Sequence, residues 1–138
     1  MAGIAYTDAQ VNFGHFIIHA LGARYHTPHG ELCGVVLPYL AEFCTKYMSA
    51  EMAQIARIIG IDPAAENFGA EMAEKIRVFV RGTGLHSLAG CGIPKEEVLE
   101  MTEMMYGGFQ SSRATASCMK QAPKAEFTHF IEKIASDQ

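Results

Sequence analysis

The sequence predicts an all-α domain, a compact bundle of about six or seven helices. Three observations favour this fold class. Apolar residues recur every three or four positions along almost the whole chain, which is the period of an amphipathic helix. Glycines and prolines fall between these periodic segments, where they end one helix and open the next. The two β-rich runs, residues 34–37 and 78–80, lie inside longer helical patterns, so no strand is predicted.

The first two helices are expected over Asp8–Ala23 and Gly30–Tyr47. The first combines apolar residues at helical spacing with His15 and His19. The second is strongly apolar but contains Pro38. Because proline has no backbone N–H, this helix should kink or break there, or have neighbours that absorb the lost hydrogen bond.

The next two helices are expected over Ser49–Ile59 and from Asp62-Pro63 to about Gly82. Serine is a frequent N-cap residue, and an Asp-Pro pair suits an N-cap followed by the first helical residue. Both segments carry apolar residues on one stripe and end at glycine, which is typical of a helix C-terminus.

The last two helices are expected from Pro94 to just before Gly107 and over Lys124–Ala135. The φ angle of proline is preset for the start of a helix. The final segment has four apolar residues on one face, which are Phe127, Phe130, Ile131 and Ile134. That face predicts a helix packed against the core.

Length and composition indicate one globular domain over residues 1–138. The chain has 11 Lys+Arg against 15 Asp+Glu, a net charge of −4, which argues against nucleic acid as a partner. The longest apolar run, Cys33–Ala41, is far shorter than the roughly 18 residues that span a bilayer. The first basic residue is Arg24, so no signal peptide is predicted. We therefore expect a cytoplasmic protein that is not membrane-bound.

The four cysteines, Cys33, Cys44, Cys91 and Cys118, form no CxxC pair. Their spacing matches neither a disulfide framework nor a zinc motif. Without a secretory signal, we interpret them as reduced thiols that pack as small buried hydrophobes.

Three histidines are candidates for metal chemistry. His15 and His19 are four residues apart, so on a helix their Cβ atoms lie roughly 5–6 Å from each other on one face. His29 follows Pro28, where a tight connection can fold it back over the first helix. The alternative is that these are satisfied core histidines. Two imidazoles alone are also fewer ligands than a catalytic metal site normally has.

Four stretches around these histidines carry a recognisable signature: GIAYTDA at 3–9, GHFIIHALGA at 14–23, YHTPHG at 25–30 and LPY at 37–39. Together they resemble the signature of iron-containing (group III) alcohol dehydrogenases. A looser likeness continues through Met52–Gly60, Leu85–Pro94 and residues 122–134. The resemblance therefore covers essentially the whole chain.

The resemblance implies the dehydroquinate synthase-like C-terminal helical domain of such enzymes, which is their metal- and substrate-binding half. The family interconverts alcohols and aldehydes by hydride transfer with NAD(P). By resemblance, His15 and His29 bind a divalent metal, with Fe2+ as the first expectation and Zn2+ as the alternative. His19 is the catalytic candidate for proton relay, and Tyr6 borders the pocket for a small alcohol or aldehyde.

Members of the family also have an N-terminal α/β half, which binds NAD(P) and contributes an Asp and a His to the metal. No Gly-rich phosphate loop is present in these 138 residues, so no residue is assigned to cofactor binding. We expect the chain alone to be inactive and to need an N-terminal α/β half supplied in trans. Without that half, apolar residues such as Tyr6, Phe13, Phe16 and Tyr25 are expected to be left uncovered, which favours a homo-oligomer or binding to an α/β partner.

Two other interpretations stay open at this level. The chain could be a stand-alone metal-binding or interaction module without redox activity. It could also be a plain helical bundle whose histidines have no function.

Overall fold

The computed structural model describes residues 14–111 and 122–137, which form seven α-helices and no strand. The helices are α2 (Gly14–Tyr25), α3 (His29–Thr45), α4 (Ser49–Ile58), α5 (Phe68–Arg81), α6 (Lys95–Glu100), α7 (Thr102–Ser111) and α8 (Lys124–Ser136). The all-α prediction is confirmed for these residues. None of the seven helices has the length and apolarity of a bilayer-spanning segment.

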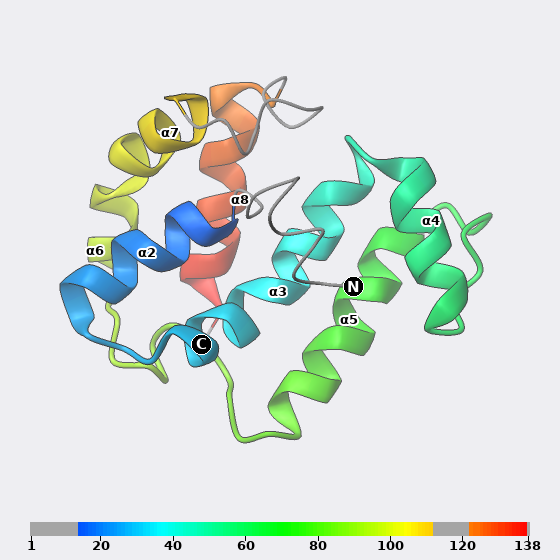
Figure 1. Ribbon diagram of the computed structural model, residues 1–138, viewed down its shortest axis with the longest axis horizontal. Coiled ribbons are helices and arrows are strands. Elements are labelled where there is room, and N and C mark those ends of the chain that lie inside the picture. The colour runs from blue at the N-terminus through cyan, green and yellow to red at the C-terminus, as the bar shows by residue number, and fades with distance from the viewer. Residues whose placement is uncertain (1–13, 112–121, 138) are drawn as a thin grey trace, which may run out of the picture.

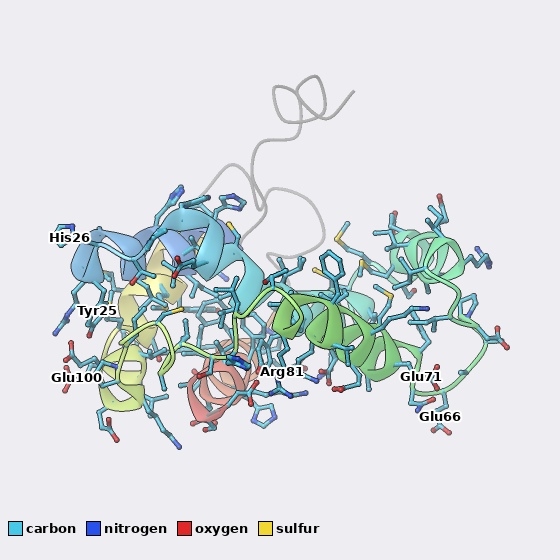
Figure 2. The ribbon with its side chains drawn as sticks, turned by 90° about the horizontal axis from the view of Figure 1, so that it is seen from below. Tyr25, His26, Glu66, Glu71, Arg81 and Glu100 are labelled. Atoms are coloured by element: carbon cyan, nitrogen blue, oxygen red, sulfur yellow. The ribbon has the colours of Figure 1, made fainter. Side chains whose placement is uncertain are left out.

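Helix α3 runs through the middle of the molecule and divides it into two unequal parts (Figure 1). Helices α2, α6, α7 and α8 lie on one side of it, and α4 and α5 lie on the other. Figure 2 shows the same division along the long axis, with Tyr25 and His26 at one end and Glu66 and Glu71 at the other.

Each part has its own apolar core. The larger core joins α2, α3, α6, α7 and α8, and its fully buried side chains include Ile17, Leu21, Leu32, Val36, Met105, Phe127 and Ile131. The smaller core joins α3, α4 and α5 through Ala41, Met52, Ala56 and Met72. Because α3 contributes to both cores, it holds α2 in a fixed position relative to the rest of the fold.

Pro38 lies inside α3, and the helix continues through it without a break. The missing N–H removes the hydrogen bond that would reach the carbonyl of Gly34. Pro38 itself is buried. Gly34 lies close to the segment that follows α5, since a Cβ atom on it would be 2.9 Å from Leu85 Cδ1. The expected break at Pro38 is therefore absent, and α3 contains the proline within one continuous helix.

The helix boundaries differ from the prediction by more than two residues in three places, and the expected helix start at Asp8 lies outside the described residues. The helix expected to end just before Gly107 continues through Gly107 and Gly108 to Ser111. The helix expected from Asp62-Pro63 begins only at Phe68, because residues 62–67 form turns. The Asp62 carboxylate accepts a hydrogen bond from the N–H of Ala64 at 3.0 Å, which is the geometry of an Asx turn. The single helix expected after Pro94 is two helices, α6 and α7, which are separated by a turn at Met101.

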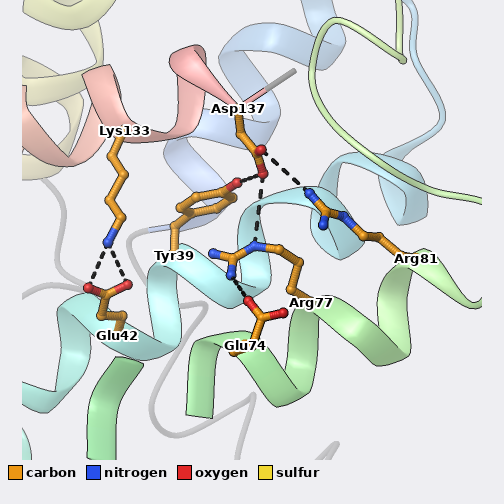
Figure 3. A network of polar contacts seen from close by, with 7 residues as sticks. All are labelled: Tyr39, Glu42, Glu74, Arg77, Arg81, Lys133 and Asp137. Atoms are coloured by element: carbon orange, nitrogen blue, oxygen red, sulfur yellow. Dashed lines mark hydrogen bonds and ion pairs between the residues drawn. The ribbon is translucent and has the colours of Figure 1, made fainter. Parts of the chain in front are cut away.

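Polar contacts tie the end of α8 to α3 and α5 (Figure 3). Asp137, directly after α8, accepts a hydrogen bond from the Tyr39 hydroxyl of α3 and lies 3.5 Å from the Arg81 guanidinium of α5. Lys133 of α8 pairs with the Glu42 carboxylate of α3 at 2.6 Å. Since partly exposed ion pairs contribute little stability individually, their main effect is to set the direction of α8.

Candidate metal site on the α2–α3 hairpin

A short connection reverses the chain between α2 and α3. Helix α2 ends at Tyr25, and His26 has a positive φ of 54°. The His26 N–H donates a hydrogen bond to the carbonyl of Gly22 at 2.9 Å, so the helix closes with a left-handed cap. Pro28 then precedes α3, and its carbonyl accepts a hydrogen bond from the N–H of Glu31 at 3.0 Å. The turn therefore brings the first residue of α3 back alongside α2.

The hairpin brings His15, His19 and His29 together. Their ring centroids form a nearly equilateral triangle, with 5.7 Å between His15 and His19, 5.3 Å between His15 and His29, and 5.5 Å between His19 and His29. The first pair comes from one face of α2, and the third ring comes from the first position of α3. The spacing in the sequence thus becomes a cluster of three imidazoles in space.

One side of this cluster faces solvent. His19 and His29 are exposed, whereas His15 is partly buried. A groove of about 340 Å³ lies beside the exposed rings, and it is lined by Ile18, His19, Gly22, Ala23, Thr27 and His29. A small molecule in this groove could reach His19 and His29 directly.

The chemistry of His15 suits metal binding. Its Nδ1 atom is buried and has no hydrogen-bond partner among the described residues, although buried polar atoms are usually paired. Burial, reinforced by the neighbouring His29 and His19, lowers the pKa of His15. The neutral imidazole that results is the form that binds a metal ion.

Cys33 also belongs to this cluster, and the sequence-based interpretation did not assign it there. Potential ligand atoms of His15, His29 and Cys33 all lie within 4.8 Å of one another. Cys33 follows His29 by four residues on α3, which places both on one face of the helix. That i, i+4 spacing was the sequence signal that could have assigned Cys33 to the site. Cys33 is partly buried and also packs against the larger core, as expected for a cysteine.

The remaining predicted residues divide into two groups. Tyr6 and Phe13 lie outside the described residues. Phe16 and Tyr25 are only partly exposed and pack against the larger core. The Tyr25 hydroxyl also donates a hydrogen bond to Glu97 of α6, and that carboxylate lies 2.8 Å from the guanidinium of Arg24. Both aromatic residues therefore help to hold α2 in place.

A second hollow, of about 330 Å³, lies between α3 and α8, away from the histidine cluster. Its lining is Tyr39, Glu42, Phe43, Lys46, Ala125, Glu126, His129, Phe130 and Lys133. The charged residues here pair with one another, as in the contacts of Lys46 with Glu126 and of Lys133 with Glu42. This hollow has no group of three potential metal ligands among the described residues.

Comparisons with known proteins identify the family and several relatives of this chain. Residues 1–134 match the model of the Fe-containing alcohol dehydrogenase family, C-terminal part. An alcohol dehydrogenase of Thermococcus barophilus is 35% identical over 112 residues, which are 77% of this chain and 28% of that protein. The long-chain-alcohol dehydrogenase 1 of Geobacillus thermodenitrificans is 29% identical over 110 residues, 75% of this chain and 27% of that protein.

A third relative aligns with nearly the whole chain. The NADPH-dependent butanol dehydrogenase of Clostridium saccharobutylicum is 26% identical over 139 aligned positions, 97% of this chain and 35% of that protein. The chain thus spans only about a third or less of the length of these relatives. The family match covers nearly every residue, and the chain belongs to the Fe-containing alcohol dehydrogenase family, as a C-terminal part of it.

Proposed function

We propose that this chain is the metal- and substrate-binding part of an NAD(P)-dependent alcohol dehydrogenase of the iron type. In this role it would interconvert a small alcohol and its aldehyde by hydride transfer. The observation that carries the proposal is the triangle of His15, His19 and His29 on one hairpin, beside a groove open to solvent.

His15 and His29 are the residues proposed to hold the metal. The unpaired, buried nitrogen of His15 and the neutral imidazole that burial favours both fit a metal ligand. When bound, a divalent ion polarises a carbonyl or hydroxyl oxygen as a Lewis acid. Family membership makes Fe2+ the first candidate and Zn2+ the alternative.

His19 is proposed to move the proton that leaves or joins the substrate oxygen. It is exposed, it lines the groove, and its ring centroid lies 5.5 Å from that of His29. A histidine imidazole can donate or accept a proton close to neutral pH. His19 is thus placed to exchange a proton with either the substrate or solvent.

The nicotinamide cofactor is proposed to bind to an α/β half, encoded in the same polypeptide or in another. Hydride transfer needs the nicotinamide to be held at near-attack distance, and this positioning lowers the barrier by several kcal/mol. The open side of the cluster, with His19 and His29 exposed, is where such a half would cover the site. The cytoplasm is the proposed location, where free thiols stay reduced.

Self-association is a related proposal. Several large apolar side chains on α4 and α5 are exposed, and among them Ile58 is 83% and Phe79 75% exposed. Covering such side chains removes apolar surface from water. A homo-oligomer, or a complex with the α/β half, would achieve this, and light scattering at several concentrations would distinguish both from a monomer.

The central experiment mixes the purified chain with the N-terminal part of a relative, such as the Thermococcus barophilus alcohol dehydrogenase. Reduction of a short aldehyde by NADH or NADPH is measured for each part alone and for the mixture. Turnover is expected only in the mixture. His19→Ala should lower it by roughly 100-fold or more, the usual contribution of a general acid or base, while the metal content stays unchanged. His86→Ala, at an exposed histidine outside the cluster, is the matched control.

Other results would contradict the proposal. Turnover by the chain alone that depends on His29 would show that no separate cofactor-binding half is needed. A metal-loaded mixture without turnover, at any ratio of the two parts, would favour a metal-binding or interaction module without redox activity.

A further inference from the structure

Cys33 lies one helical turn after His29 on α3, and both side chains lie near His15 of α2. The potential ligand atoms of the three residues lie within 4.8 Å of one another. Bond lengths of about 2.0–2.3 Å to zinc place neighbouring ligands roughly 3.5 Å apart. The three side chains therefore need to close by only about 1 Å to share an ion.

We infer that the Cys33 thiolate is a third protein ligand of the metal held by His15 and His29, and that it makes the site favour Zn(II) over Fe(II). The inference rests on the proposed metal site and adds a ligand that changes which metal is preferred. Within this chain alone, the resulting set is two imidazoles and one thiolate, to which the Asp and His that the resemblance assigns to an α/β half would add.

The chemistry of the three ligands explains the preference for Zn(II) over Fe(II). Thiolate is a soft ligand and favours zinc, whereas Fe(II) in open oxygen-reactive sites is typically held by two histidines and a carboxylate. In the chain alone, which is what the titration below measures, three protein ligands and one open position match the arrangement of a catalytic zinc. The exposed rings of His19 and His29 and the adjoining groove lie at the same cluster, so the open position would be accessible to a small molecule.

The thiol must lose its proton to act as a ligand. Burial raises the pKa of the Cys33 thiol, so the metal-free protein holds this residue in its neutral form near pH 7. A coordinating metal deprotonates a thiol directly. The neutral state without metal is therefore consistent with Cys33 as a ligand when metal is present.

The competing explanation is that Cys33 only packs against the larger core. A serine substitution separates the two roles, because it nearly preserves the shape of the side chain and removes the soft ligand atom. Cys44 provides the matched control. It lies on the same helix, eleven residues further on, which is about 16 Å along the axis.

The experiment is a titration of the full chain with Co(II), whose absorption spectrum reports on thiolate ligands. The parent protein and Cys44→Ser should both show a near-ultraviolet thiolate-to-cobalt charge-transfer band, and Cys33→Ser should lack it. In competition titrations, Cys33→Ser should lose zinc affinity by at least about tenfold, since even changes to outer-shell partners of a metal typically cost about 10–100-fold. The affinity for Fe(II), measured without oxygen, should fall less.

A second variant tests whether Cys33→Ser loses metal affinity only because the protein no longer folds. Cys33→Asp should restore binding of Fe(II) through a hard carboxylate ligand and still show no charge-transfer band, and circular dichroism should be unchanged. Two results would overturn the role of Cys33 but not the metal site. One is a parent protein that binds Co(II) through His15 and His29 without the charge-transfer band. The other is a band that persists in Cys33→Ser. Co(II) binding that does not depend on His15 or His29 would overturn the proposed metal site as well.

Discussion

Gly69 of α5 and Thr45 of α3 approach so closely that a Cβ atom on the glycine would lie 2.5 Å from Thr45 Oγ1 and 3.0 Å from Thr45 Cγ2. The threonine cannot turn away easily, because its own Cβ would lie 3.2 Å from the added atom. Its hydroxyl also donates a hydrogen bond to the carbonyl of Glu42 at 2.6 Å. Only a glycine at position 69 allows α3 and α5 to pack at this distance.

Gly69→Ala is therefore expected to destabilise the fold by about 1–3 kcal/mol, the usual cost of overpacking, despite the better helix propensity of alanine. The measurement is the free energy of unfolding in urea. The double variant Thr45→Ala with Gly69→Ala should recover part of the loss, because the nearest two atoms are removed. Equal stability of Gly69→Ala and the parent would mean that the helices separate at little cost.

Tyr39 predicts how stability depends on alkaline pH. Burial, together with its hydrogen bond to Asp137 and the charge of that carboxylate, raises the pKa of Tyr39 from 10.0 to about 12. The unfolded chain therefore loses this proton first. The stabilisation is fully present below pH 10 and is lost as the pH rises towards about 12, by up to about 2.5 kcal/mol.

The check is urea unfolding as a function of pH in the parent and in Tyr39→Phe. The substitution removes the hydroxyl, so the variant should lose less stability across this range. Tyr47→Phe is an informative comparison, because the pKa of Tyr47 is also raised to about 12, by burial and by Glu126. A parent whose stability is constant between pH 10 and 12 would contradict the burial of these hydroxyl groups.

His26 provides a prediction about the connection between α2 and α3. Its φ of 54° costs an L-residue roughly 1–2 kcal/mol, which glycine avoids. Since glycine also loses more chain entropy on folding, His26→Gly should gain only about 0.5–1 kcal/mol. His26→Ala should give no gain, because alanine has the same steric conflict. The melting temperatures of both variants test this, and a stabilising alanine would show that the backbone strain is absent.

Metal binding should be visible as thermal stabilisation. At a free Zn(II) concentration 100 times Kd, the stabilisation has an upper limit of about 2.7 kcal/mol, which applies to a ligand that binds only the folded state. The double variant His15→Ala with His29→Ala should show no such increase, and a chelator should reverse it in the parent. His86→Ala should respond as the parent does. An unchanged shift in the double variant would place the metal elsewhere.

The fold class and most helices could be predicted because their signals are local. The helices that begin at Ser49 and Lys124 start where the sequence indicates, since apolar periodicity is a property of a few adjacent residues. The prediction of Ser49 as the N-cap was wrong, because Met48 takes that position and Ser49 is the first helical residue. The start of α5 could not be predicted in this way. Asp followed by Pro suits a turn as well as a helix start, and here the Asp62 carboxylate is used within the turn.

The candidate site, like the helix boundaries, could be predicted from the sequence only in part. His15, His19 and His29 could be grouped from their spacing and from the resemblance to a known family. Cys33 was not assigned to the site, although its i, i+4 spacing from His29 distinguishes it from Cys44, because a cysteine in an apolar helix usually serves packing. The direction of α3 relative to α2, which the sequence does not give, decides whether His15 joins His29 and Cys33.

Because its ligands all lie within the α2–α3 hairpin, the metal site can form in part before the rest of the chain folds. All four candidate groups, from His15 to Cys33, lie close together in the chain, so bringing them together closes only a short loop, at low entropic cost. An unfolded chain can therefore gather part of the same ligands around an ion. Metal binding to that ensemble would reduce the stabilisation of the folded state, and the ion could be captured during synthesis, before α8 has been made.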